Sequence, residues 1–157
     1  MCYTSHMKIS AKARYGLRIL LDIALHETPE RPRLMKEICE SQSLSEKFTS
    51  RLVIPLREAG MIHSLRGKSG GFRLAKATSD ITLLDVIETL QGPISLVDCV
   101  QQPKTCPKGK ACAARSVWLD VNMAVRAALA GVTLEKVLVR TQEAGCDVPA
   151  ALTEYSI

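Results

Sequence analysis

The fold is decided by residues 42–74, QSLSEKFTSRLVIPLREAGMIHSLRGKSGGFRL. Ser45 has the side chain of a helix N-cap and Gly60 is a typical helix stop, which together predict a helix over about 46–59. Pro55 conflicts with this prediction, because a proline inside a helix costs about 3 kcal/mol. We therefore expect the helix to kink or to lose its regular form at that residue.

Two short runs of alternating apolar and polar residues follow this helix, at 61–66 and 71–74. They flank Gly67-Lys68-Ser69-Gly70, and this pattern predicts a two-stranded hairpin with a flexible basic tip. A basic glycine-rich loop can also hold a nucleotide phosphate, but this one is too short and lacks the following helix of a phosphate-binding loop. The hairpin is therefore interpreted as a wing.

Two further helices are predicted before this stretch. Ser10 can cap a helix over about 11–27 that carries an apolar stripe, and a turn-rich segment leads to a short helix over about 34–41. The link 42–44 joins the second helix tightly to the third. Three helices, the last two closely joined and followed by a wing, outline a winged helix-turn-helix.

The second half of the chain is predicted to be helical around one irregular loop. Thr82 can cap a helix over about 83–91, and residues 92–111, with three prolines and two glycines, show no period. A long helix over about 113–130 and a last helix over about 134–143 follow.

The long helix carries more apolar surface than a short neighbouring helix would cover. Val117, Val121, Val125 and Ala128 recur at helical spacing, and Trp118, Met123 and Leu129 widen the surface. Such a helix is either buried in the core or pairs with its copy in a homodimer, and the second interpretation is preferred.

Charge is distributed unevenly over the 157 residues, whose formal net charge is +5. Residues 1–79 hold 14 Lys and Arg against 7 Asp and Glu, a balance of +7, whereas residues 80–157 hold 7 against 9, a balance of −2. A basic N-terminal half suits a polyanion such as nucleic acid, although a solvated basic face has the same composition. No apolar run reaches the roughly 18 residues of a membrane span, and the start lacks a secretory pattern, so we expect a cytoplasmic protein without membrane association.

These patterns divide the chain into four parts. Residues 1–6 resemble a cloning scar, 7–80 are the expected winged helix-turn-helix DNA-binding domain, 81–144 hold a linker helix, a cysteine loop and the dimerisation helices, and 145–157 form a tail. The expected fold class is mostly α, with a two-stranded wing and a long C-terminal dimerisation helix.

The third helix is expected to read double-stranded DNA, because in a winged helix-turn-helix its exposed N-terminal side chains meet bases and phosphates. Hydroxyls and lysine suit phosphates, arginine can bond guanine at two atoms, and glutamate can accept from cytosine. The residues predicted to do so are Ser45, Glu46, Lys47, Thr49, Ser50 and Arg51. Ser45 can equally be only a cap, and Arg66 and Lys68 of the wing tip are expected to meet the backbone or the minor groove.

Three of the six cysteines cluster in the irregular loop. Cys99, Cys106 and Cys112 are separated by six and five residues, and soft thiolates in such a loop suggest an iron-sulfur cluster, 2Fe-2S or 4Fe-4S. A structural zinc site usually has a more closely spaced cysteine pair and four protein ligands. Lysines among the cysteines favour the thiolate form over the thiol, and this environment suits a thiol switch equally well. Cluster, thiol sensor and inert thiols all stay open on spacing alone.

Motifs along most of the chain resemble those of one known family. They are KISAKARYGL at 8–17, LS at 44–45, PLREAG at 55–60, RG at 66–67, GGF at 70–72, Leu74 and the three cysteines. On these residues, the chain over about 7–144 resembles the Rrf2 family of bacterial winged-helix regulators. The resemblance implies a homodimeric repressor or activator that reads a palindromic operator and is not an enzyme.

The resemblance also bears on the cysteines. In cluster-bearing members three loop cysteines are ligands, which maps onto the three cysteines named above. Some members have a histidine ligand where this chain has Arg115, and others an acidic ligand where it has Arg14. The fourth ligand is therefore open among Asp98, a non-protein group and a partner-subunit group. Cluster-free members lack these cysteines, and thiol oxidation or binding of a small effector is the alternative mode of sensing.

Overall fold

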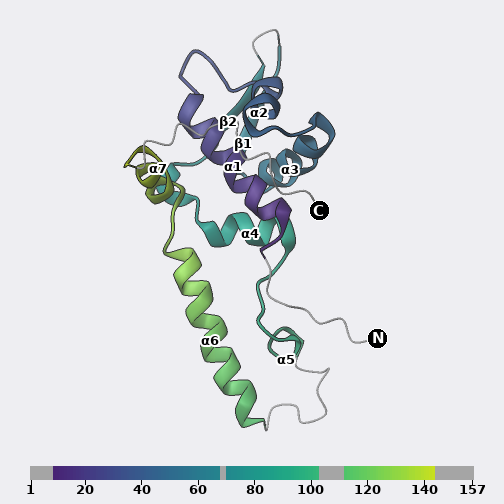
Figure 1. Cartoon of the computed structure of the whole chain (residues 1–157), viewed down its shortest axis with the longest axis vertical. Coiled ribbons are helices and arrows are strands. Elements are labelled where there is room, and N and C mark those ends of the chain that lie inside the picture. The colour runs from purple at the N-terminus through teal and green to yellow at the C-terminus, as the bar shows by residue number, and fades with distance from the viewer. Residues whose placement is uncertain (1–8, 68–69, 103–111, 144–157) are drawn as a thin grey trace.

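The structure, a computed structural model, describes residues 9–67, 70–102 and 112–143 (Figure 1). In chain order its elements are α1 (Ala11–His26), α2 (Met35–Gln42), α3 (Glu46–Glu58), β1 (Ile62–Leu65), β2 (Gly71–Leu74), the 3-10 turn η1 (Thr78–Asp80), α4 (Leu83–Gln91), α5 (Asp98–Gln101), α6 (Ala113–Ala130) and α7 (Leu134–Glu143). The described part of the chain is thus mostly helical with one two-stranded antiparallel sheet, as predicted.

Local sequence explains how the helix-turn-helix forms. The Ser10 hydroxyl accepts a hydrogen bond from the backbone N–H of Ala13, and the Ser45 hydroxyl accepts one from Phe48, so both serines are N-caps. Ser43, which follows α2, adopts a left-handed conformation with φ 53°. This residue turns the chain sharply, and three residues suffice to connect α2 with α3.

Pro55 lies inside α3 and does not end it, so the second of the two outcomes that we expected, a loss of regular helix at this residue, is excluded. The helix continues to Glu58, and the backbone N–H of Ala59 donates to the Pro55 carbonyl at 2.9 Å. The missing proline donor leaves the carbonyl of Arg51 without its helical partner. The helix nevertheless continues for three residues beyond the proline.

The wing is attached to the segment that precedes α2. Its strands pair antiparallel with Ile62 opposite Leu74, and Arg33 adds an isolated bridge to Phe72 through two backbone hydrogen bonds of 2.8 and 3.0 Å. A Cβ atom at Gly71 would lie 2.7 Å from the Arg33 carbonyl oxygen, so glycine permits this close approach.

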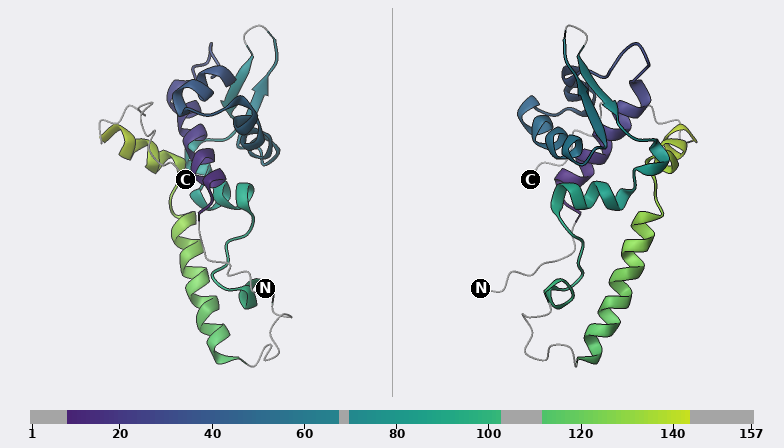
Figure 2. Two further views of the ribbon diagram at one scale, coloured as in Figure 1. Left: turned by 45° about the vertical axis from the view of Figure 1, so that its right-hand side comes forward. Right: turned by 180° about the vertical axis from the view of Figure 1, so that it is seen from behind.

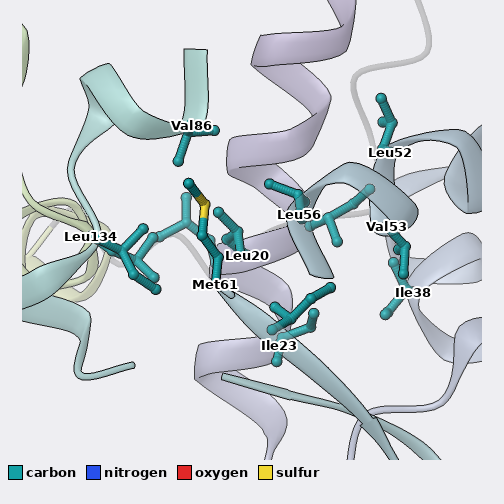
Figure 3. Close-up of a cluster of buried hydrophobic side chains, with 13 residues drawn as sticks. Leu20, Ile23, Ile38, Leu52, Val53, Leu56, Met61, Val86 and Leu134 are labelled. Carbon is teal, nitrogen blue, oxygen red and sulfur yellow. The ribbon is translucent and has the colours of Figure 1, made fainter. Parts of the chain in front are cut away.

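The hydrophobic core is built around α1 and includes elements from both halves of the chain. Its members shown in Figure 3 include Leu20, Ile23, Ile38, Leu52, Val53, Leu56, Met61, Val86 and Leu134. Full burial of such an apolar side chain stabilises the fold by about 1.5–3 kcal/mol. Since α4 supplies Val86 and α7 supplies Leu134, both helices belong to the same core as the helix-turn-helix.

Residues 92–102 and 112–131 form an arm that leaves this core and returns to it (Figures 1 and 2). The chain runs outward after α4 to α5, and α6 leads back to α7. At the base of the arm, Thr82 and Thr133 form an isolated antiparallel bridge, flanked by backbone hydrogen bonds of 2.8 Å. No helix in the described ranges is long and apolar enough to cross a membrane.

A buried carboxylate holds α1, α2 and the base of the wing together. Asp22 is fully buried and accepts from Arg33 Nε at 2.8 Å, from Ser41 Oγ at 2.7 Å and from Gln42 Nε2 at 3.4 Å. Arg33 is also the residue whose backbone pairs with the wing. A buried charge is tolerated when it is paired and hydrogen-bonded in this way.

We predict that Asp22→Ala lowers the free energy of unfolding by about 3–5 kcal/mol, because it removes the buried acceptor shared by Arg33, Ser41 and Gln42 and leaves the Arg33 guanidinium only its longer ion pair with Glu37 at 3.6 Å. The matched control is Asp80→Ala at an exposed carboxylate, which should cost less than about 1 kcal/mol. Urea denaturation followed by circular dichroism measures both. Equal effects of the two substitutions would contradict the role assigned to Asp22.

Candidate nucleic-acid interface and cysteine segment

The first turns of α3 present polar side chains to solvent. Ser45, Glu46, Lys47 and Arg51 are exposed and Ser50 is half-buried. Lys47 and Arg51 are four residues apart and therefore lie on one side of the helix. Together with the partial positive charge of a helix N-terminus, they make this end of α3 attractive to phosphate.

Thr49 does not belong to this exposed face, so the expectation that it is available to DNA is wrong. Its side chain is fully buried, and its hydroxyl donates to the Ser45 carbonyl at 3.1 Å and accepts from the Cys39 thiol at 3.3 Å. The helical period puts Thr49 on the same side as the core residues Leu52 and Leu56. Thr49 thus braces α3 against α2.

Aromatic contacts, which sequence reasoning missed, fix α3 against α1. The rings of Tyr15 and Phe48 meet edge to face with centroids 5.7 Å apart, and the Arg18 guanidinium lies 5.3 Å from the Tyr15 centroid. Arg18 Nε also donates to Gln42 Oε1 at 2.8 Å. The recognition helix is therefore oriented by side chains from both preceding helices. The sequence signal for this contact was Phe48, an aromatic residue three positions after the Ser45 cap.

At the wing, Arg66 is exposed directly after β1, and Gly67 follows with φ 107°, a conformation that favours glycine. Lys68 lies outside the described residues. Arg73 on β2 is directed to the opposite loop, where its Nη2 donates to the Pro29 carbonyl at 2.5 Å. Among the described residues of the wing, Arg66 is thus the exposed cation next to the tip.

Two of the three clustered cysteines lie on segments that the same residue ties together. Cys99 is in α5 and Cys112 precedes α6, and both are half-buried. Arg115 donates its backbone N–H to the Cys112 carbonyl at 3.1 Å and its Nε to the Cys99 carbonyl at 2.9 Å. These bonds place α5 beside the start of α6, as Figure 1 shows.

The described residues fit part of an iron-sulfur site. The thiols of Cys99 and Cys112 are free and suit soft iron, whereas Cys106 lies outside the described residues. Within the described ranges, no three His, Cys, Asp or Glu side chains gather in a group that could hold a metal ion. Arg115 cannot be a ligand, because a guanidinium has no lone pair to donate in proteins.

The face of α6 that meets the outgoing chain carries a row of polar side chains, Arg115, Asn122 and Arg126, which we name the polar seam. Buried Asn122 accepts from the Leu96 backbone N–H at 3.1 Å. Arg126 forms a two-pronged ion pair with Glu88 of α4, with Nη2 3.1 Å from Oε2. The spacings of seven and four residues put the three side chains on one side of the helix.

The outer face of α6 is apolar and exposed. Val117 is 58% exposed, Trp118 44%, Val121 41% and Met123 65%. These side chains were expected either in the core or at a dimer interface, and the first interpretation is excluded. At 3.6 residues per turn, Val117, Val121 and Trp118 lie within about 100° of one another around the helix, whereas Met123 lies on another side. The exposed apolar surface formed by these three side chains is typical of a surface for association.

A capped recognition helix with exposed cations, supported by two helices and flanked by a wing, defines a winged helix-turn-helix DNA-binding protein. Residues 9–140 match the family model of Rrf2, described as an iron-dependent transcriptional regulator. The chain therefore belongs to the Rrf2 family, and it is a DNA-binding transcriptional regulator.

Individual relatives agree with this assignment. The HTH-type transcriptional regulator CymR of Bacillus subtilis is 39% identical over 129 residues, which cover 82% of this chain and 88% of CymR. The structure of this CymR, described as the global cysteine regulator, matches with a TM-score of 0.71 and 37% identity, and covers 86% of this chain and 98% of its own.

IscR proteins are similar over the same region. The HTH-type transcriptional regulator IscR of Photorhabdus laumondii is 32% identical over 137 residues, or 87% of this chain and 82% of its own. The structure of T. potens IscR matches with a TM-score of 0.68 and 32% identity, over 89% of this chain and 92% of its own. The predicted fold class is confirmed, as is the expectation of a regulator rather than an enzyme.

Glu88 provides a pH-dependent test of the arm. The hydrogen bond from Arg126 lowers the pKa of Glu88 below its usual value, an effect that outweighs partial burial of the carboxyl. Because the pKa is depressed in the folded state, the stabilisation is present above about pH 4.5 and is lost as pH falls through the folded-state pKa. We predict that Glu88→Gln costs about 1 kcal/mol at pH 7 and that this cost declines as pH falls below about 4.5.

The measurement is urea denaturation of both proteins at pH 7 and pH 3. Glu30→Gln, at an exposed glutamate, should behave like the unchanged protein at both values. A cost of Glu88→Gln that is independent of pH would show that the carboxylate charge does not stabilise the arm.

Proposed function

We propose that this regulator is a cytoplasmic homodimer that represses or activates transcription by binding a palindromic operator with two winged modules. We propose further that the segment bearing the three cysteines sets its affinity for DNA. The exposed apolar surface of α6 formed by Val117, Trp118 and Val121, beside the polar seam, is the observation that carries this proposal, because it supplies the surface through which two copies can be held at a fixed separation.

The DNA-reading residues divide into two groups with different roles. Arg51 and Glu46 have the chemistry to select bases, whereas the hydroxyls and Lys47 suit phosphates. The proposed contacts are Ser45, Glu46, Lys47, Ser50, Arg51, Arg66 and Lys68. Thr49 is omitted because its hydroxyl is buried and already bonded to Ser45 and Cys39.

The proposed dimer packs the outer faces of two α6 helices against each other. Such an arrangement is isologous, so each copy contributes the same apolar side chains, among them Val117 and Val121. A twofold dimer matches a palindromic site, with recognition helices about 34 Å apart in successive major grooves. A shift of a few ångströms in that separation would prevent both helices from engaging, which makes the base of the arm a suitable point of control.

Cys99, Cys106 and Cys112 are proposed to hold an iron-sulfur cluster, 2Fe-2S or 4Fe-4S. The support is the family description as iron-dependent, the similarity to IscR proteins, and the two bonds of Arg115 that hold the Cys99 and Cys112 segments together. When bound, the cluster would supply a group whose presence depends on iron, oxidants and nitric oxide. The fourth ligand would come from Asp98, a non-protein group or the partner subunit.

Sensing by the cysteine thiols themselves, or by binding of a small effector, is the second candidate. It is favoured by Arg115, which takes up the place of a possible ligand with a side chain that cannot bind iron. Similarity to the regulator described as the global cysteine regulator of B. subtilis also supports it. Under this alternative the dimer and the DNA-reading surface are unchanged.

For DNA binding, we predict that Arg51→Ala weakens binding to a duplex selected from a random library by about 5- to 150-fold, since one base-reading contact is worth about 1–3 kcal/mol. Arg57→Ala is the matched control, because it removes the same charge from the exposed last turn of the same helix. It should change affinity by less than about 3-fold. Titrations at several salt concentrations measure both.

Equal losses for the two substitutions would contradict the orientation of the recognition helix that we propose. Absence of any salt-sensitive binding by the unchanged protein would contradict the DNA-binding role itself.

For the cluster, we predict visible sulfur-to-iron absorption bands after anaerobic reconstitution, and loss of these bands in each of Cys99→Ala, Cys106→Ala and Cys112→Ala. Cys39→Ala is the control, because this thiol is buried against Thr49 in the helix-turn-helix and should not affect the bands. A colourless protein without bound iron or sulfide would reject the cluster and leave the thiol mechanism. Retention of the bands in Cys106→Ala would reject the ligand set.

A further inference from the structure

The polar seam of α6 contacts three successive parts of the outgoing chain. Arg126 pairs with Glu88 near the end of α4, Asn122 binds the backbone of Leu96, and Arg115 binds the backbone of Cys99. The proposed function assigns no role to Asn122 or to the ion pair of Arg126. All three contacts join α6 to the segment that leads from the winged module to the cysteines.

This segment, residues 92–97, which we name the connector, is held largely by side chains. The backbone N–H of Ile94 donates to Glu88 Oε1 at 3.1 Å, and that of Leu96 donates to Asn122. Ile94 is also buried against Ala13 and Ile87. Because the connector lies outside any helix or strand, its conformation depends on these bonds, on the bond from Ser95 Oγ to the Val97 carbonyl at 2.8 Å and on buried Ile94.

Glu88 is the residue of α4 that bonds both the connector and α6. Its carboxylate accepts from the backbone of Ile94 and from the guanidinium of Arg126, so it bonds the two sides of the arm at once. A displacement of either side therefore acts on α4. Loss of either partner therefore changes the hydrogen bonding of a carboxylate that belongs to α4.

Movement of α4 would act directly on the recognition helix. α4 packs against α1 and α3, and Val86 of α4 lies in the same core cluster as Leu52 and Leu56 of α3. Packing against α1 is close, because a Cβ atom at Gly16 would lie 2.0 Å from Leu90 Cδ1. A tightly packed core transmits a displacement rather than absorbing it.

We infer that Glu88 and Arg126 are positioning residues that couple the cysteine segment to the recognition helix, while Arg115 and Asn122 hold that segment against α6. The inference rests on the proposed function, because it assigns residues to the transmission of the proposed signal. Glu88 and Arg126 contact neither the cysteines nor the DNA-reading side chains in the described part of the chain. Their substitution should therefore change the response to the signal more than the binding of DNA itself.

The test compares DNA affinity of the full chain with its loop thiols free and after alkylation with N-ethylmaleimide, with modification of Cys99 and Cys112 verified by mass spectrometry. In the unchanged protein we expect the two affinities to differ by about 5- to 150-fold, the usual range for coupled sites. In Arg126→Gln and in Glu88→Gln this ratio should fall below about 2-fold, while the affinity with free thiols changes by less than about 3-fold. Arg140→Gln, at an exposed arginine of α7, should keep the full ratio.

A second measurement separates this inference from the proposed function. Hydrogen exchange of α4 peptides is followed by mass spectrometry, before and after alkylation and without DNA. In the unchanged protein, alkylation should speed exchange in both the connector and α4, whereas in Arg126→Gln it should affect the connector alone. If DNA affinity does not respond to alkylation but α4 does, the sensing role fails and the coupling stands. If α4 does not respond in the unchanged protein, or if Arg126→Gln keeps the full response, the inference is overturned.

Discussion

The ion pair between Glu88 and Arg126 bonds the inward face of α6 to α4 and so ties the arm to the core of the winged module. Asn122 and Arg115 lie on the same side and add bonds to the connector and to α5. With polar side chains facing the protein, the apolar ones are left on the outside, where burial against a second copy would stabilise them. The same contacts therefore leave a surface for association and bond α4 to the arm that carries the cysteines.

The winged module, in contrast to the arm, is held mainly by apolar packing, and its buried polar groups join neighbouring helices. Asp22 gathers α1, α2 and the base of the wing, and Thr49 locks the start of α3 to Cys39 of α2. Rigid support of this kind keeps the exposed Lys47 and Arg51 in a fixed relation to each other. A rigid winged module joined to a hydrogen-bonded arm suits the proposed dimer, in which two winged modules must keep a fixed spacing.

Much of the fold could be predicted from the sequence, because helix ends are local events. Thr82 marks the start of the helix at 83–91 and Gly92 follows its end. The helices at 113–130 and 134–143 also have the predicted bounds. What could not be predicted depends on which side of a helix meets the core. Thr49 is polar like its exposed neighbours, and the inward position of Asn122 could not be inferred from the spacing of the apolar residues of α6. Pro55 lies inside a continuous helix although an interior proline is locally unfavourable, because tertiary packing supplies most of a helix's stability.

Sedimentation equilibrium tests the division of α6 into two faces most directly. The account predicts that the unchanged protein has twice the mass of its 17.2 kDa chain, and that Val121→Glu on the outer face becomes monomeric with its helical circular dichroism intact. Val139→Glu, at a comparably exposed valine of α7, should remain dimeric. A monomeric unchanged protein, or a dimer that survives Val121→Glu, would contradict the account.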